Sequence, residues 1–73
     1  MPGPRLHPYR SPLAEYPIAT HARALGFDVE IARLLIGERT ELRTLGKFRD
    51  GKWVYSVASA ERIAAAIRQR RAG

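Results

Sequence analysis

The sequence predicts a mainly helical α+β domain in which three helices accompany one two-stranded antiparallel β-hairpin. Two observations lead to this prediction. Apolar residues recur at helical spacing in three segments, near residues 13–25, 28–37 and 59–71. Between the second and third segments, Asp50-Gly51 lies inside a stretch of alternating side chains, which is typical of a tight hairpin turn.

The length and composition limit the protein to one small folded unit. Residues 1–12 hold four of the five prolines and are predicted to form a flexible arm, which leaves residues 13–73 for the domain. A domain this small buries only about 60% of the surface of its unfolded chain, so a deep substrate pocket is not expected. Without cysteine, disulfides and thiolate metal sites are excluded. With no signal peptide or spanning segment visible, we expect a soluble intracellular protein without a membrane partner.

The first predicted helix begins at Leu13 or Pro17 and ends at Leu25, because Gly26 suits the left-handed residue that terminates a helix. Asp28 is the expected N-cap of a second helix that ends near Ile36. Core-facing residues of these helices are predicted to be Ile18, Ala22, Leu25, Ile31, Leu34 and Leu35. Two short helices joined by a tight glycine turn form a helix-turn-helix candidate.

The hairpin is predicted to be amphipathic. A turn at Asp50-Gly51 places Arg49 opposite Lys52, and side chains then alternate between two faces. The predicted core face consists of Phe48, Trp53, Tyr55 and Val57. The other face carries Lys47, Arg49, Lys52 and Val54. Like charges opposite each other destabilise a hairpin by electrostatic repulsion. Either an anionic ligand or the solvent around an exposed turn would reduce that repulsion.

The last helix is predicted to start at an N-cap formed by Ser59, with Glu61 in its first turn. Its core-facing stripe is Ala60, Ile63, Ala64 and Ile67. Arginines crowd its end, where the helix dipole alone explains them.

The charge is distributed unevenly. The net charge is +6; residues 42–73 carry eight basic and two acidic side chains, whereas residues 28–41 carry four acidic side chains and two arginines. This asymmetry favours a polyanionic partner for the C-terminal half, although high charge also serves solubility alone. No spacing typical of a catalytic, metal or phosphate-loop motif is present, so we expect no enzyme, cofactor, metal site or small-molecule substrate.

Three short segments resemble the MerR-type and excisionase-type winged helix-turn-helix domains, which share the predicted order of elements. Residues 22–27 (ARALGF) resemble the A-x-x-L-G-V that ends the family's first helix. Residues 34–38 (LLIGE) resemble the x-L-I-x-G-E that closes the second, and residues 42–46 (LRTLG) are similar to the R-T-x-G that enters the wing. The likeness extends over about residues 16–70.

The resemblance implies a small protein that binds double-stranded DNA, with the second helix in the major groove and the hairpin as the wing. It further implies regulation of transcription or excisionase-like direction of recombination, a cytoplasmic, nucleoid-associated location, and self-association on DNA. The residues it places on DNA are Arg33, Arg43, Thr44, Lys47, Arg49 and Lys52. Asp28 and Glu30 depart from the family pattern, in which serine, arginine or threonine opens the second helix, so the wing is expected to supply more of the affinity.

Two other functions compete with DNA binding. The acidic second helix, which does not suit DNA, favours a protein-interaction module, an adaptor or phage-encoded inhibitor that uses its arginines to bind an acidic partner. Aromatic residues exposed on the hairpin would favour an RNA- or ribosome-associated protein, because unpaired bases stack on them. The prediction that Phe48, Trp53 and Tyr55 point inward ranks that function third.

Overall fold

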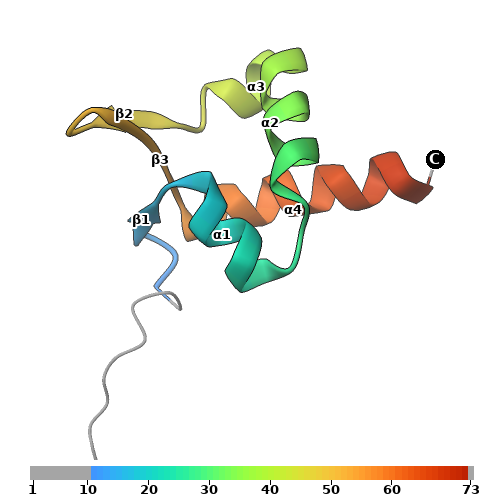
Figure 1. The fold of residues 1–73 in the computed structure, drawn as a ribbon, viewed down its shortest axis with the longest axis horizontal. Coiled ribbons are helices and arrows are strands. Elements are labelled where there is room, and N and C mark those ends of the chain that lie inside the picture. Colours follow the sequence, from blue (N-terminus) through green and yellow to red (C-terminus); the bar gives the residue numbers. More distant parts are fainter. Residues whose placement is uncertain (1–10, 73) are drawn as a thin grey trace, which may run out of the picture.

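A computed structural model describes residues 11–72, which fold into helices packed against a small antiparallel sheet (Figure 1). The predicted arm falls largely on residues 1–10, outside the described residues. In chain order the elements are β1 (Glu15–Tyr16), α1 (Ile18–Leu25), α2 (Val29–Glu38), α3 (Thr40–Arg43), β2 (Lys47–Arg49), β3 (Lys52–Ser56) and α4 (Val57–Ala72). The mainly helical α+β class is therefore confirmed.

The hairpin has the predicted register and turn. Phe48 lies opposite Trp53, and Arg49 lies opposite Lys52. Asp50 and Gly51 both have positive φ, 50° and 78°, as a type I′ turn requires. A third strand was not predicted: β1 pairs with the other edge of β3, which gives the order β1-β3-β2. Two residues are too few to produce a recognisable alternation in the sequence.

The first two helices begin and end by different means. Gly26 ends α1 in the left-handed conformation at φ 77°, as predicted, while Pro17 stands before the helix as its extended N-cap. The Asp28 carboxylate accepts hydrogen bonds from the backbone N–H groups of Glu30 (2.8 Å) and Ile31 (3.3 Å), which confirms the predicted N-cap of α2.

The end of α2 and the start of α4 differ from prediction. Helix α2 continues through Gly37 to Glu38, and the short helix α3, which was not predicted, follows after the extended residue Arg39. Ser56, rather than Ser59, occupies the capping position of α4. The Ser56 hydroxyl accepts from the Ser59 backbone N–H at 3.1 Å, so the prediction of a Ser59 cap was wrong by one turn.

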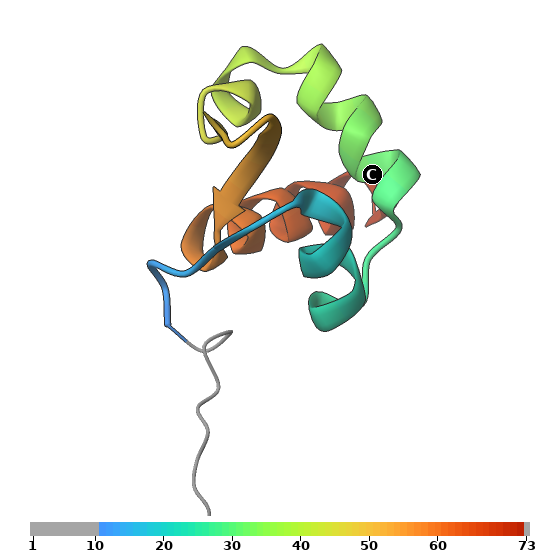
Figure 2. The same ribbon diagram turned by 60° about the vertical axis from the view of Figure 1, so that its left-hand side comes forward.

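Helix α4 lies at the centre of the fold and contacts α1, α2 and β3 (Figure 2). The predicted stripe of α4 is confirmed, because Ala60, Ile63, Ala64 and Ile67 are all buried. Helix α2 packs on it mainly through Ala32 and Leu35. Leu34 was predicted to face the core but is about half exposed, since its position on α2 turns away from α4.

His21 connects α1 to the sheet from within the core. Its side chain is fully buried, and its Nε2 hydrogen-bonds the Tyr55 carbonyl on β3. The Tyr16 ring of β1 meets the imidazole edge-on, with ring centroids 5.6 Å apart. Burial lowers the pKa of His21 below its usual 6.5, and backbone hydrogen bonds to Tyr55 and Tyr16 offset this only in part. The neutral ring is therefore the form that fits the fold.

We expect the folded state to lose stability as the pH falls below about 6.5, because the unfolded chain then binds a proton at His21 more readily than the native state does. Above that pH the stabilisation is fully present. Urea unfolding of the wild type at pH 7.5 and pH 5 should show this loss, and His21→Gln should show less of it. His7→Gln, which alters the other histidine, is the control; an equal pH response in wild type and His21→Gln would contradict the assignment.

Gly46 permits a close approach that another residue would block. A Cβ at this position would lie 2.8 Å from the buried Tyr55 ring, whereas one at Gly37 would meet nothing within 4 Å. Gly46→Ala should therefore destabilise the protein by about 1–3 kcal/mol through overpacking. Gly37→Ala should be neutral, or stabilising by up to about 1 kcal/mol. Both effects are measured as changes in the free energy of unfolding in urea. Equal effects of the two substitutions would show that the Tyr55 ring moves aside at no cost in stability.

Candidate nucleic-acid interface

An apolar groove runs along β3 between the hairpin and the helices. It consists of two open hollows of about 280 and 380 Å³ that share Ile36, Trp53 and Tyr55 as lining residues. We call this feature the Trp53 groove. Its first hollow is also lined by Pro17, Ile18, Ala19 and Arg33, and its second by Arg43 and Thr44. Each hollow thus contributes one arginine, and no carboxylate of residues 11–72 lines either of them.

Trp53 and Phe48 are exposed, contrary to the prediction that they face the core. Their side chains are 56% and 60% accessible, and their rings pack edge-to-face with centroids 5.3 Å apart. The predicted alternation is nevertheless correct, because Tyr55, further along the same face, is buried. The hairpin extends past the helical core (Figure 1), so its inner face is covered only near its base. Sequence alternation identifies a face but not how far the core reaches along it.

The opposite face of the hairpin is cationic, as predicted, but β1 adds a carboxylate to it. Glu15, only a quarter exposed, lies 3.1 Å from Arg49 Nε and 3.6 Å from Lys47 Nζ. Lys52 makes no ion pair with any residue between 11 and 72. The chain therefore supplies its own anion to the face where the sequence suggested that a ligand or solvent would relieve repulsion. This contact was missed because β1 itself was not predicted.

Two of the predicted contact residues hold the local fold together. Arg43 donates to the Gly37 carbonyl (2.6 Å) and to Thr40 Oγ1 (3.0 Å), which joins α3 to the end of α2. The Thr44 hydroxyl donates to the Glu41 carbonyl at 3.1 Å and closes α3. Neither acceptor of Arg43 is a carboxylate, so its positive charge remains uncompensated at the groove.

Arg33 lies on α2 and lines the first hollow, the one of about 280 Å³. Its guanidinium is 3.6 Å from the Glu30 carboxylate, and both side chains are more than half exposed, so this pair contributes little and exchanges readily with other anions. The structure therefore divides the six predicted residues between two surfaces. Arg33, Arg43 and Thr44 line the Trp53 groove, whereas Lys47, Arg49 and Lys52 project from the opposite face of the hairpin.

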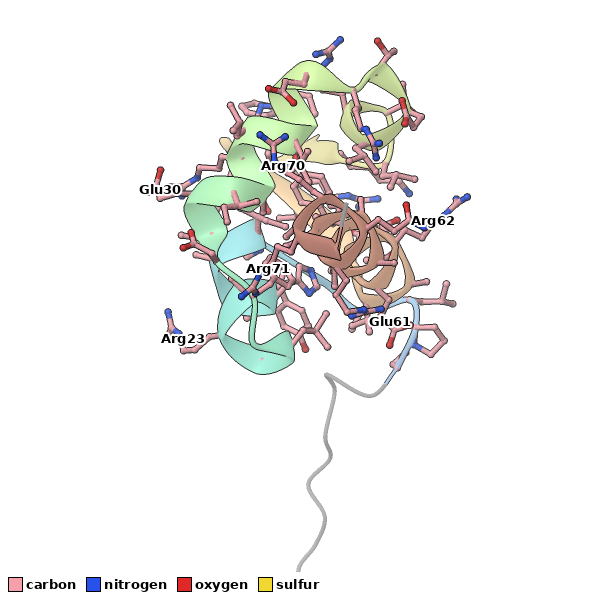
Figure 3. The ribbon with its side chains drawn as sticks, turned by 90° about the vertical axis from the view of Figure 1, so that its right-hand side faces the viewer. Arg23, Glu30, Glu61, Arg62, Arg70 and Arg71 are labelled. Carbon is pink, nitrogen blue, oxygen red and sulfur yellow. The ribbon has the colours of Figure 1, made fainter. Side chains whose placement is uncertain are left out.

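The other arginines among residues 11–72 do not line the groove. In Figure 3, Arg23 and Arg62 extend to opposite sides of α4. Arg70 pairs with Glu38 at 3.3 Å and connects the end of α4 to the end of α2. These positions provide charge-matched controls for the groove.

No family model, curated protein or solved structure matches this chain. Within the described residues, no three histidine, aspartate or glutamate side chains come together as a metal site would require. Nor does any helix of residues 11–72 have the length and apolar character to cross a bilayer. The Trp53 groove and the cationic face of the hairpin are therefore the two candidate binding surfaces.

Removing the Glu15 carboxylate should strengthen binding to polyanions. Glu15→Gln frees Lys47 and Arg49 from their internal partner, and exposed pairs of this kind are worth up to about 1 kcal/mol. We expect roughly a two- to fivefold higher affinity for heparin at low salt, measured by titration and by elution from a heparin column.

Glu61→Gln is the control, because it changes the net charge equally but lies beside Leu25 and Arg68, away from the hairpin. Equal gains in both variants would show that net charge, and not the release of these two cations, controls the binding.

Proposed function

We propose that the protein binds double-stranded DNA as a winged helix-turn-helix domain, with α1 and α2 as the helix pair and the β2–β3 hairpin as the wing. The observation that carries the proposal is the charge of the Trp53 groove, because Arg33 and Arg43 are the only ionic residues that line it in the described part of the chain. The groove lies between α2 and the wing, the two elements that would meet the duplex. A phosphate backbone supplies the anions that such a surface lacks.

The acidic start of α2 is compatible with this proposal. Asp28 is engaged as the N-cap and accepts two backbone hydrogen bonds, and Glu30 is paired with Arg33. Both carboxylates thus have local roles, which explains their presence at a helix that would approach DNA. A phosphate that binds Arg33 would displace Glu30 from it, at small cost for so exposed a pair.

The wing would add phosphate contacts from its outer face. Lys52, beside the turn, is the cation on this face without an internal partner among residues 11–72, and Arg49 and Lys47 share one carboxylate. We propose on the same basis that the chain acts on DNA as a regulator of transcription or as an excisionase-like factor that directs recombination. Self-association on repeated sites would compensate for the small contact area of one domain.

Salt dependence tests the proposal. With four to six phosphates neutralised, the slope of log K against log salt should be about −4 to −5, measured by fluorescence anisotropy on labelled duplexes. Arg33→Gln and Lys52→Gln should each flatten the slope by about one unit, because each is expected to meet one phosphate. Arg49 is less suitable for this test, since its loss would also release Glu15.

Arg23→Gln and Arg62→Gln remove the same charge at sites outside the groove and the wing, and should leave the slope nearly unchanged. Slopes that flatten equally in all four variants would mean that binding follows total charge alone. A chain that binds no duplex even at low salt would refute the proposal.

The exposed aromatic rings favour contact with unpaired bases, and the exposed apolar side chains together favour one second function of another class, docking of another protein. Leu34 on α2 is about half exposed, as are Trp53 and Phe48 on the hairpin, and Arg33 and Arg43 line the Trp53 groove between these elements. Such a surface suits an acidic partner with an apolar segment. Indifference to all nucleic acids, together with binding to an acidic amphipathic peptide, would favour this function over DNA binding.

A further inference from the structure

Two aromatic rings are exposed on the inner face of the wing, where a core position would be expected. More than half of each side chain of Phe48 and Trp53 is accessible. The pair lies one position from the Arg49–Lys52 pair that flanks the turn, so a ligand can approach it from the tip of the hairpin. Two large aromatic rings that pack on each other and remain exposed favour a contact surface.

The surroundings of Trp53 restrict what that contact can be. The Trp53 side chain lines both apolar hollows, one of which is also lined by Arg33 and the other by Arg43. A complementary ligand has a flat, apolar centre and a negative charge on each side of it. A nucleotide within a strand has this arrangement, because its base lies between two phosphates along the chain.

We propose that the Phe48–Trp53 pair stacks with an unpaired nucleobase, while Arg33 and Arg43 bind the phosphates on either side of it. The inference rests on the proposed nucleic-acid function and specifies its target: a strand with an unstacked base, as in a bulge, a gap or a single-stranded end. In an intact duplex every base face is covered by its neighbours, so the aromatic pair would touch only the edges and sugars.

The edge-to-face packing of the two rings supports this role. The interplanar angle is 63°, so the two ring planes cannot both lie along one surface, and one ring supports the other from the side. Trp53 is thereby held in place without being covered. A stacking platform needs this combination, because a mobile ring would lose more side-chain entropy when a base binds.

The sole tryptophan of the chain reports directly on the contact. We would titrate the full chain with four oligonucleotides: a continuous 15-base-pair duplex, the same duplex with one unpaired adenine, and one of its strands as DNA and as RNA. Trp53 fluorescence reports stacking, and the anisotropy of labelled oligonucleotides gives the affinities. The DNA and RNA strands distinguish the two sources of an unpaired base.

The bulged duplex should bind on the order of 5- to 100-fold more tightly than the continuous one, the range expected for one stacked base. Ligands with an unpaired base should also quench Trp53 fluorescence more strongly. Trp53→Leu, which keeps an apolar side chain but removes the aromatic face, should abolish the preference, and Phe48→Leu should reduce it. Leu34→Ala, an exposed apolar change on α2 outside the groove lining, should preserve it. Circular dichroism would confirm that each variant is folded.

The outcomes separate this inference from the proposed function. Equal affinities for bulged and continuous duplexes, with the expected salt slope, would overturn the stacking role and leave duplex binding in place. Quenching by single strands without binding to a continuous duplex would support stacking and overturn the duplex proposal. Failure to bind any of the four ligands would overturn both.

Discussion

The position of the hairpin depends on how Tyr55 is held at its base. Its carbonyl is bound by the buried His21, its backbone pairs with Tyr16 of β1, and its ring packs closely over Gly46. Helix α1, strand β1 and the loop before β2 therefore all meet at one residue of the central strand. On one side of it lies the core built on α4; on the other lies the exposed part of the wing. This single anchor separates the residues that stabilise the protein from those available to a partner.

The elements with strong local signals were predictable from the sequence. Asp50-Gly51 determined the turn, and with it the whole register of the hairpin; Gly26 and Asp28 marked a helix end and a helix start; and the alanine- and isoleucine-rich stripe identified the core face of α4. Each of these signals comes from backbone geometry or from a period sustained over several turns. The same signals would predict these elements in any chain that forms them.

What could not be predicted depends on contacts distant in sequence. Strand β1 has two residues and exists because β3 offers it a free edge, so Glu15 could not be placed beside Lys47 and Arg49. The exposure of Trp53 depends on how far the helices extend along the hairpin, which no alternation pattern encodes. The candidate site was accordingly predicted only in part: its arginines and lysines were identified, but not their division between two surfaces, nor the aromatic pair on one of them.

The junction between β3 and α4 has a mechanical consequence. The strand ends at Ser56 and the helix begins at the next residue (Figure 2). The Ser56 hydroxyl accepts a hydrogen bond from the Ser59 backbone N–H in the first turn. No linker residue stands between the strand and the helix to act as a hinge. The packing of the core therefore determines the orientation of the wing relative to the helices. A partner that contacts both the wing and α2 has to adapt its own shape to that orientation.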